Sequence, residues 1–205
     1  MVMSSWMKRL SCIALAAVIA VPVVAAKKAP TAPGTYKAWG PDIDELEIVR
    51  TFDASDYSNV VVQPLDVSAT PRPEDADLVE KVSNVLSKAA EPFAEGIAKN
   101  ASSLEVSTEE GKAAARGTLI VRGRVTLLDP GSRSKRLFIG YGAGAGRAAI
   151  KGEIVDAATG EVLLRFTQER LSWQERFGRG SSYEEIMKRN LHAIGKDVAN
   201  ILKAF

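Results

Sequence analysis

The sequence lacks most of the residue types that metal centres, disulfides and acyl-transfer triads require. Among its 205 residues there are one cysteine and one histidine. A structural zinc site takes about four cysteine or histidine ligands, and a catalytic triad needs a histidine beside its nucleophile. The single histidine, His192, lies just off the apolar stripe of a predicted helix, where we expect a partly exposed surface residue. The sequence therefore predicts no metal, no cofactor and no catalytic residue.

The sequence also has no excess of positive over negative side chains, which argues against a nucleic-acid partner. Without the first 26 residues, 25 basic side chains balance 25 acidic ones. Their distribution is uneven, because residues 27–116 carry 10 basic and 16 acidic side chains and residues 117–205 carry 15 and 9. We expect an anionic partner to contact the C-terminal half.

The first 26 residues have the layout of a secretory signal peptide. Lys8 and Arg9 precede an apolar run over residues 10–26 that ends in small side chains. We expect cleavage after Ala26 and a periplasmic protein, with outer-membrane association as the alternative. An uncleaved anchor is disfavoured by the short run and its Pro22. A lipoprotein is disfavoured because Cys12 begins the apolar run, whereas a lipidated cysteine ends it.

After the leader, residues 27–45 are predicted to be an extended linker because of Pro30, Pro33 and Pro41, and residues 46–205 a single α/β domain. Strands are predicted over residues 59–67, 118–128, 148–155 and 162–169. A helix is expected to begin near Glu74 and to kink or restart at Pro92. The predicted fold is α/β of the α+β kind, in the order β-α-β-β-β-α. It has a mixed or antiparallel sheet of about four strands with two main helices on one face.

Two patterns specify the C-terminal half in more detail. In residues 118–128 the apolar side chains Leu119, Val121, Val125 and Leu127 share one face. The strands at 148–155 and 162–169 form a hairpin whose turn uses Asp156 as an acceptor of amides and Gly160 for a positive φ.

The last helix carries an apolar stripe at helical spacing. A capping box precedes it, formed by Ser181 with Glu184 or by Ser182 with Glu185. The stripe predicts a core helix, and a coiled-coil seam with a partner helix is the alternative. Its members are Met187, Leu191, Ile194, Val198, Ile201 and Phe205.

A basic, glycine-rich segment follows the strand at 118–128. A dinucleotide fingerprint fits the glycines loosely, but a strand follows where that motif requires a helix. Two interpretations stay open: structural glycines packed against the domain, or a basic and apolar surface that contacts a partner, a polyanion or lipid. The structural glycines are Gly140, Gly142, Gly144 and Gly146, with Gly160 in the hairpin turn. The candidate contact residues are Arg133, Lys135, Arg136, Phe138, Tyr141 and Arg147.

A second basic and aromatic segment lies just before the last helix and includes Trp173 and Phe177. It suits an interface anchor, or else its aromatic rings cover an edge of the sheet. Asp129 and Asp156 both lie at strand ends, where a glycosidase-like pair would act on cell-wall glycan, although carboxylates at turns usually cap amides.

As a set, these motifs resemble the bacterial envelope family named domain of unknown function forty-four ten. The likeness rests on the glycine-rich run at 139–144, the turn at 156–160 and the amphipathic last helix, and covers residues 58–205. It implies an exported α/β domain without a known reaction. The hairpin turn is also similar, more loosely, to secretion lipoproteins of the curli type.

The function expected from the sequence is non-enzymatic binding of another envelope component, either a protein or an anionic component. A polyanion or lipid-surface binder is the second hypothesis, with membrane contact that is peripheral only. A carboxylate-dependent hydrolase is the third, and the sequence leaves a homo-oligomer open.

Overall fold

The computed structural model describes residues 29–108, 116–131, 145–172 and 182–205. In these residues a mixed sheet of seven strands has the order β1-β2-β7-β6-β5-β3-β4. β3 is parallel to β4 and β5, and the other neighbours are antiparallel. The strands are β1 (Gly34–Trp39), β2 (Ile43–Ile48), β3 (Asn59–Val62), β4 (Glu105–Ser107), β5 (Thr118–Asp129), β6 (Arg147–Asp156) and β7 (Val162–Leu171).

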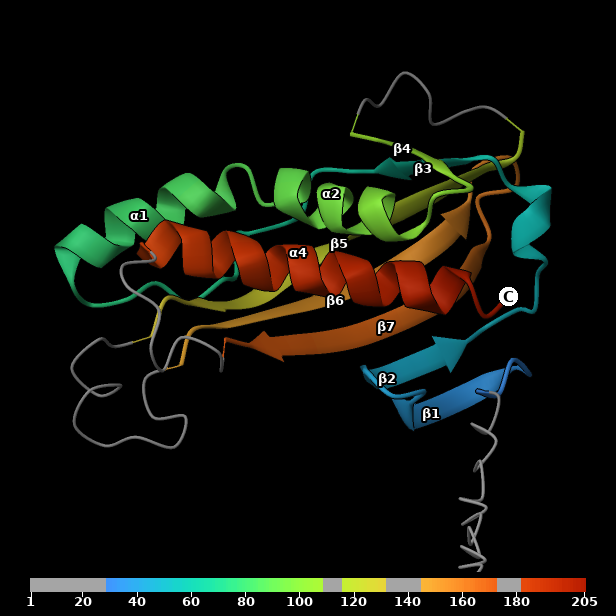
Figure 1. Cartoon of the computed structure of the whole chain (residues 1–205), viewed down its shortest axis with the longest axis horizontal. Coiled ribbons are helices and arrows are strands. Elements are labelled where there is room, and N and C mark those ends of the chain that lie inside the picture. Colours follow the sequence, from blue (N-terminus) through green and yellow to red (C-terminus); the bar gives the residue numbers. More distant parts are fainter. Residues whose placement is uncertain (1–28, 109–115, 132–144, 173–181) are drawn as a thin grey trace, which may run out of the picture.

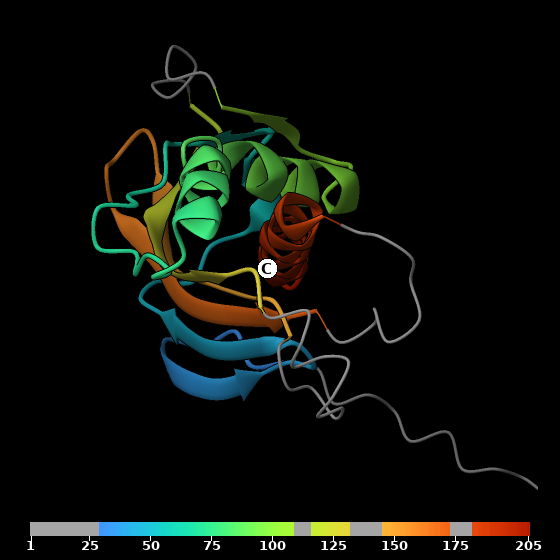
Figure 2. The same cartoon turned by 90° about the vertical axis from the view of Figure 1, so that its left-hand side faces the viewer.

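Helices α1 (Ala76–Leu86), α2 (Ala90–Asn100) and α4 (Tyr183–Leu202) lie on one face of this sheet, in front of the strands in Figure 1. A short 3-10 helix spans Ala54–Asp56. Figure 2 shows the same layering from the side, with the curved sheet against the helices. We call the sheet face away from the helices the open face. None of the described helices is long and apolar enough to cross a membrane.

The α+β class is confirmed, but the expectation of about four strands is too low. β4 has only three residues, too few to show a period. β1 and β2 begin inside the predicted linker, so that prediction is wrong from Gly34 onward. The prolines flank the strands instead of interrupting them, since Pro33 precedes β1 and Pro41 lies in the turn to β2. β2 pairs with β7 and buries Ile43, Leu46 and Ile48.

The predicted long helix is two helices, and the break precedes Pro92 instead of coinciding with it. α1 ends at Leu86, and α2 restarts at Ala90, so Pro92 lies in the first turn of α2, where a missing N–H is tolerated. The strand predicted over 59–67 ends at Val62, and only a single bridge continues it, between Asp66 and Arg124.

The capped C-terminal helix is confirmed as part of the core. Ser182 and Glu185 form the capping box of α4. Each stripe residue within the helix is buried, and Phe205, just past it, stacks on Phe52 with ring centroids 4.8 Å apart. The coiled-coil alternative is therefore wrong for this stripe, because the sheet and α2 already cover it.

α4 packs on α2 with almost no space between the two backbones. A Cβ at Gly96 would overlap the carbonyl oxygen of His192, and a Cβ at Gly195 would overlap that of Phe93. Glycine at both positions lets the helices approach at backbone contact, which fixes α4 against α2.

The β6–β7 hairpin follows the prediction, but β5 departs from it near its end. A register shift between Val125 and Leu127 places Leu128, which is 2% exposed, in the core. The bulge inserts one residue, so Leu128 is buried in the core where Leu127 was expected.

Candidate functional site

Most of the contact residues predicted from the sequence lie outside the described residues. This holds for both segments that combine basic and aromatic side chains. The residues are Arg133, Lys135, Arg136, Phe138, Tyr141, Trp173 and Phe177, together with Gly140, Gly142 and Gly144. The structure does describe the strand ends from which these two segments start, and the position of the candidate binding site follows from these strand ends.

The ends of three adjacent strands meet in one row. Asp129 at the end of β5 is opposite Arg147 at the start of β6, and Arg147 is opposite Leu171 at the end of β7. The two segments therefore leave the sheet from neighbouring strands at the same end. Leu171 is 41% exposed, so an apolar side chain faces solvent at this row.

Arg147 differs from its prediction as a free basic contact. Its guanidinium pairs with Glu169, with 2.6 Å between Nη2 and Oε1, and its side chain is 46% exposed. Glu169 lies diagonally across on β7, within reach of a long side chain on the same face. The charge of Arg147 is thus neutralised within the sheet by Glu169 of the neighbouring strand. The sequence did not indicate this pair, because the two residues lie far apart along the chain.

Two of the predicted structural glycines lie in described residues and have different roles. At Gly146 a Cβ would overlap Cγ2 of Ile186 in α4, so this glycine packs closely against the helix. Gly160 has a φ of +73° in the hairpin turn. Asp156 accepts hydrogen bonds from the amides of Ala158 and Thr159 at 2.8 and 2.9 Å, as the turn chemistry predicts.

Asp129 and Asp156 cannot act as a catalytic pair. Asp156 lies opposite Leu119 in the β5–β6 register, ten residues from Asp129 along β5. At about 3.3 Å per residue the two carboxylates are about 30 Å apart, whereas glycosidase pairs lie within about 10 Å. Asp129 instead accepts from the amide of Gly131 at 2.7 Å. Both carboxylates cap turns, which overturns the basis of the hydrolase hypothesis.

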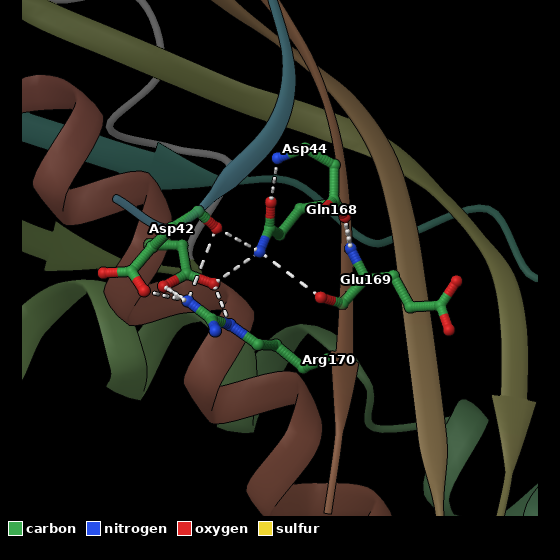
Figure 3. A network of polar contacts seen from close by, with 6 residues as sticks. Asp42, Asp44, Gln168, Glu169 and Arg170 are labelled. Carbon is green, nitrogen blue, oxygen red and sulfur yellow. Dashed lines mark hydrogen bonds and ion pairs between the residues drawn. The ribbon is translucent and has the colours of Figure 1, made fainter. Parts of the chain in front are cut away.

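Beside the row of strand ends, a polar network joins β7 to α4 and to the start of β2. Figure 3 shows Arg170 turned toward Asp42, and the guanidinium of Arg170 pairs with the carboxylate of Asp197 on α4. Arg170 donates to both oxygens of Asp197, and its Nη2 lies 3.4 Å from Oδ1 of Asp42. Gln168 donates to Asp197 at 2.9 Å and to the carbonyl oxygen of Asp42 at 2.7 Å.

Charge and burial act in opposite directions on Asp197, which is 1% exposed. Burial raises the pKa of Asp197, while the hydrogen bonds from Arg170 and Gln168 favour its ionised form. The hydrogen bonds to Asp197 raise the pKa of Arg170, which keeps the guanidinium charged.

A cavity of about 380 Å³ lies against this network, and we call it the Asp197 cavity. Asn190 lines it and is 3% exposed. Its Oδ1 accepts from Ser172 at 2.7 Å, but its Nδ2 has no hydrogen-bond partner in the structure described here. Exposed Lys196 also lines the Asp197 cavity. A buried amide donor and an ammonium suit a ligand group that accepts hydrogen bonds, such as a carbonyl or carboxylate.

His192 is half-buried on α4, as predicted, and lies with Lys88 and Glu95 along a shallow pocket between α2 and α4. Within the described ranges there is no group of three or more histidine, cysteine or acidic residues able to hold a metal.

Sequence reasoning missed Arg170, Asp197 and Asn190. One signal was available: Asp197 and Asn190 interrupt the apolar side of the last helix, between stripe residues. A polar residue on a buried helix face needs a partner; Arg170 at the end of β7 supplies it for Asp197, and Ser172, just after the strand, supplies it for Asn190.

Comparison with solved structures finds chains of low sequence identity. PelC from Paraburkholderia phytofirmans, a dodecamer, is 14% identical, with 78% of this chain and 97% of that chain covered and a TM-score of 0.44. The hypothetical protein CT253 from Chlamydia trachomatis is 12% identical, covering 72% of this chain and 99% of that chain, with a TM-score of 0.38. Lipoprotein GNA1162 from Neisseria meningitidis is 12% identical, with 70% and 97% covered and a TM-score of 0.28.

No curated protein matches the sequence. A family model does match, over residues 48–174, which is more than half of the chain. The match runs from the last residue of β2 to just beyond β7, and so includes the row of strand ends. The chain belongs to the family described as Domain of unknown function (DUF4410), the one that its sequence motifs resemble.

Proposed function

We propose that this protein is exported to the bacterial envelope, where it binds another envelope component without catalysing a reaction. The binding site is the end of the sheet formed by the row Asp129, Arg147 and Leu171, together with the Asp197 cavity that the end of β7 lines. One observation carries the proposal: the two segments that combine basic and aromatic residues leave from adjacent strands in the row Asp129, Arg147, Leu171.

The cavity adds a specific feature to this surface. Asn190 offers a buried donor without a partner, and Lys196 adds a positive charge beside it. Together with exposed Leu171, these groups suit a partner that inserts an acceptor group next to an apolar contact.

Crosslinked capture from envelope extract, at low and at physiological salt, tests the proposal. Replacing Arg133, Lys135 and Arg136 together by Ser should reduce capture of the partner and leave the melting temperature nearly unchanged, because exposed charges contribute little to folding. The matched control replaces Lys37, Lys88 and Lys203, which are exposed on other elements, and should leave capture unchanged.

Salt dependence separates the competing functions. A buried protein interface should retain its partner at physiological salt, whereas a polyanion or lipid-surface binder should lose affinity steeply. Equal capture by both triple variants would reject this end of the sheet as the binding site. Light scattering on the same samples would show whether the component bound is a second copy of the chain.

A further inference from the structure

We propose a second binding site, for a small anion, on the open face of the sheet between Arg124 and Lys151. A groove of about 560 Å³ lies there, on the face that none of the described helices covers. It spans β2, β7, β6 and β5 and is separate from the Asp197 cavity, with which it shares no lining residue.

The floor of this open-face groove is bare backbone. Gly123 and Gly152 are opposite each other in β5 and β6, and Gly152 is opposite Phe166 in β7. A Cβ at Gly152 would lie 2.5 Å from Cζ of Phe166, and a Cβ at Gly123 would overlap the carbonyl oxygen of Lys151. The missing side chains of both glycines lie on the core side of the sheet, where Phe166 packs, so the sheet requires glycine at both positions. The open-face groove runs between the two rows of charged side chains on either side of this backbone.

On one side of the floor, the charges neutralise one another. Arg165 lies between Glu47 and Glu153, at 3.1 and 3.6 Å, and Arg122 pairs with Glu153 at 2.6 Å. Each of these two cations thus has an acidic partner on a neighbouring strand. This row leaves no cation for a ligand.

On the other side, two cations are opposite each other. Arg124 in β5 and Lys151 in β6 are register partners, and both are exposed. Neither side chain forms an ion pair or hydrogen bond with another described residue, and the acid whose charge acts on Arg124 within the described residues is Asp66, its bridge partner. Like charges directly opposite across two strands destabilise a sheet. Asp66 and Glu45 flank the two cations, and Asp66 accepts from the amide of Ser68 at 2.9 Å.

An anionic group seated between Arg124 and Lys151 removes this repulsion and gains charge-assisted hydrogen bonds from both side chains. The bare floor gives it room, and the neutral row opposite offers both donors and acceptors to the rest of the ligand. The chemistry fits a carboxylate or a phosphate on a small organic molecule, and two probes distinguish these sources.

The test is a titration of the mature chain with inorganic phosphate and, separately, with acetate, at ionic strength held constant with chloride. Amide shifts of Gly123 and Gly152 are followed by NMR. We expect saturable shifts with one of the two anions. Arg124→Gln and Lys151→Gln should each weaken the binding by about tenfold, the loss of one charge-assisted hydrogen bond.

Lys88→Gln, on the helix side, is the matched control and should bind like the parent. Without added anion, Lys151→Gln should melt no lower than the parent, because it removes a like-charge pair. Shifts that fail to saturate with either anion, or that are equal in all three variants, would overturn the proposal.

Discussion

Arg170 on β7 binds both carboxylate oxygens of Asp197 on α4, so an ion pair with a buried carboxylate and a partly buried guanidinium joins the sheet to the helix above it. The pair lies under the Asp197 cavity and beside the strand ends that carry the proposed binding segments. Its geometry therefore sets the position of α4 relative to the site, and its energetics can be measured directly.

Removing one partner of this pair should destabilise the protein more than removing both. Asp197→Leu leaves the partly buried Arg170 without its main counterion and should lower the free energy of unfolding by about 3 kcal/mol. The double variant Arg170→Met with Asp197→Leu should lose less than Asp197→Leu alone, and so far less than the sum of the losses of Asp197→Leu and Arg170→Met. Urea denaturation of the four proteins gives the coupling, and additive losses would show that the pair contributes nothing specific.

The contact between α2 and α4 should tolerate no added methyl group. Gly96→Ala and Gly195→Ala each place a Cβ on a backbone carbonyl oxygen, so the helices must separate, at a loss of about 1–3 kcal/mol. Exposed Lys196→Ala, next to Gly195, serves as the control and should change stability by less than about 0.5 kcal/mol. Melting curves of the two glycine variants that match the parent would contradict this backbone contact.

The C-terminal helix should behave as core, not as a detachable tail. Leu191 and Ile194 are both 0% exposed. Truncating either to Ala should cost about 2–5 kcal/mol through lost burial and the cavity left behind. The exposed Lys188→Ala, on the same helix, is the comparison. Thermal melts of the Leu191 and Ile194 variants within a degree of the parent would argue against this packing.

Sequence periodicity predicted the elements whose apolar residues repeat over several turns or strand pairs. The stripe of α4 and the alternation of β6 and β7 are long enough for this, and the turn at Asp156 and Gly160 follows from local chemistry alone. β1 was missed because its residues are almost all exposed, and only Trp39 at its end is buried. A strand with one buried side chain has no alternating pattern, so prolines on both sides made the segment resemble a linker.

The site depends on contacts that no local pattern contains. Arg170 and Asp197 are 27 residues apart, and Arg147 finds Glu169 at a separation of 22. Both pairs form because neighbouring strands and the crossing of α4 bring the charges together. Sequence analysis could recognise the charged residues, but the register that neutralises Arg147 and leaves Arg124 opposite Lys151 requires the sheet.

Export predicts a defined N-terminus for the native protein. Signal peptidase should cut after Ala26, because small residues end the apolar run there. Intact-mass analysis of protein purified from the native envelope should give a chain that starts at Lys27. A product that retains the first 26 residues, or that carries lipid on Cys12, would contradict this prediction and the proposed location together.

The hydroxyl of Tyr57 donates to Asp156 at 2.7 Å, and this hydrogen bond should make stability depend on pH in the acid range. It is the main cause that lowers the pKa of Asp156, with the turn amides adding to it. A carboxylate whose pKa is lower in the folded than in the unfolded state stabilises the fold above the unfolded value of about 3.9, and this contribution disappears as the pH falls through the folded value. Burial and the same hydrogen bond raise the pKa of Tyr57, so the hydroxyl stays a donor throughout that range.

Tyr57→Phe should therefore lower the free energy of unfolding by about 1 kcal/mol at neutral pH, and the difference from the parent should shrink below about pH 4. Tyr36→Phe is the matched control, since Tyr36 donates to the carbonyl oxygen of Ala32 at 3.0 Å and no carboxylate takes part. Its effect should not vary over the same range. Urea denaturation at a series of pH values from neutral to acid measures both. If the Tyr57→Phe difference stays constant across the series, the hydrogen bond does not favour the ionised form of Asp156, and the link between this turn and acid stability is wrong.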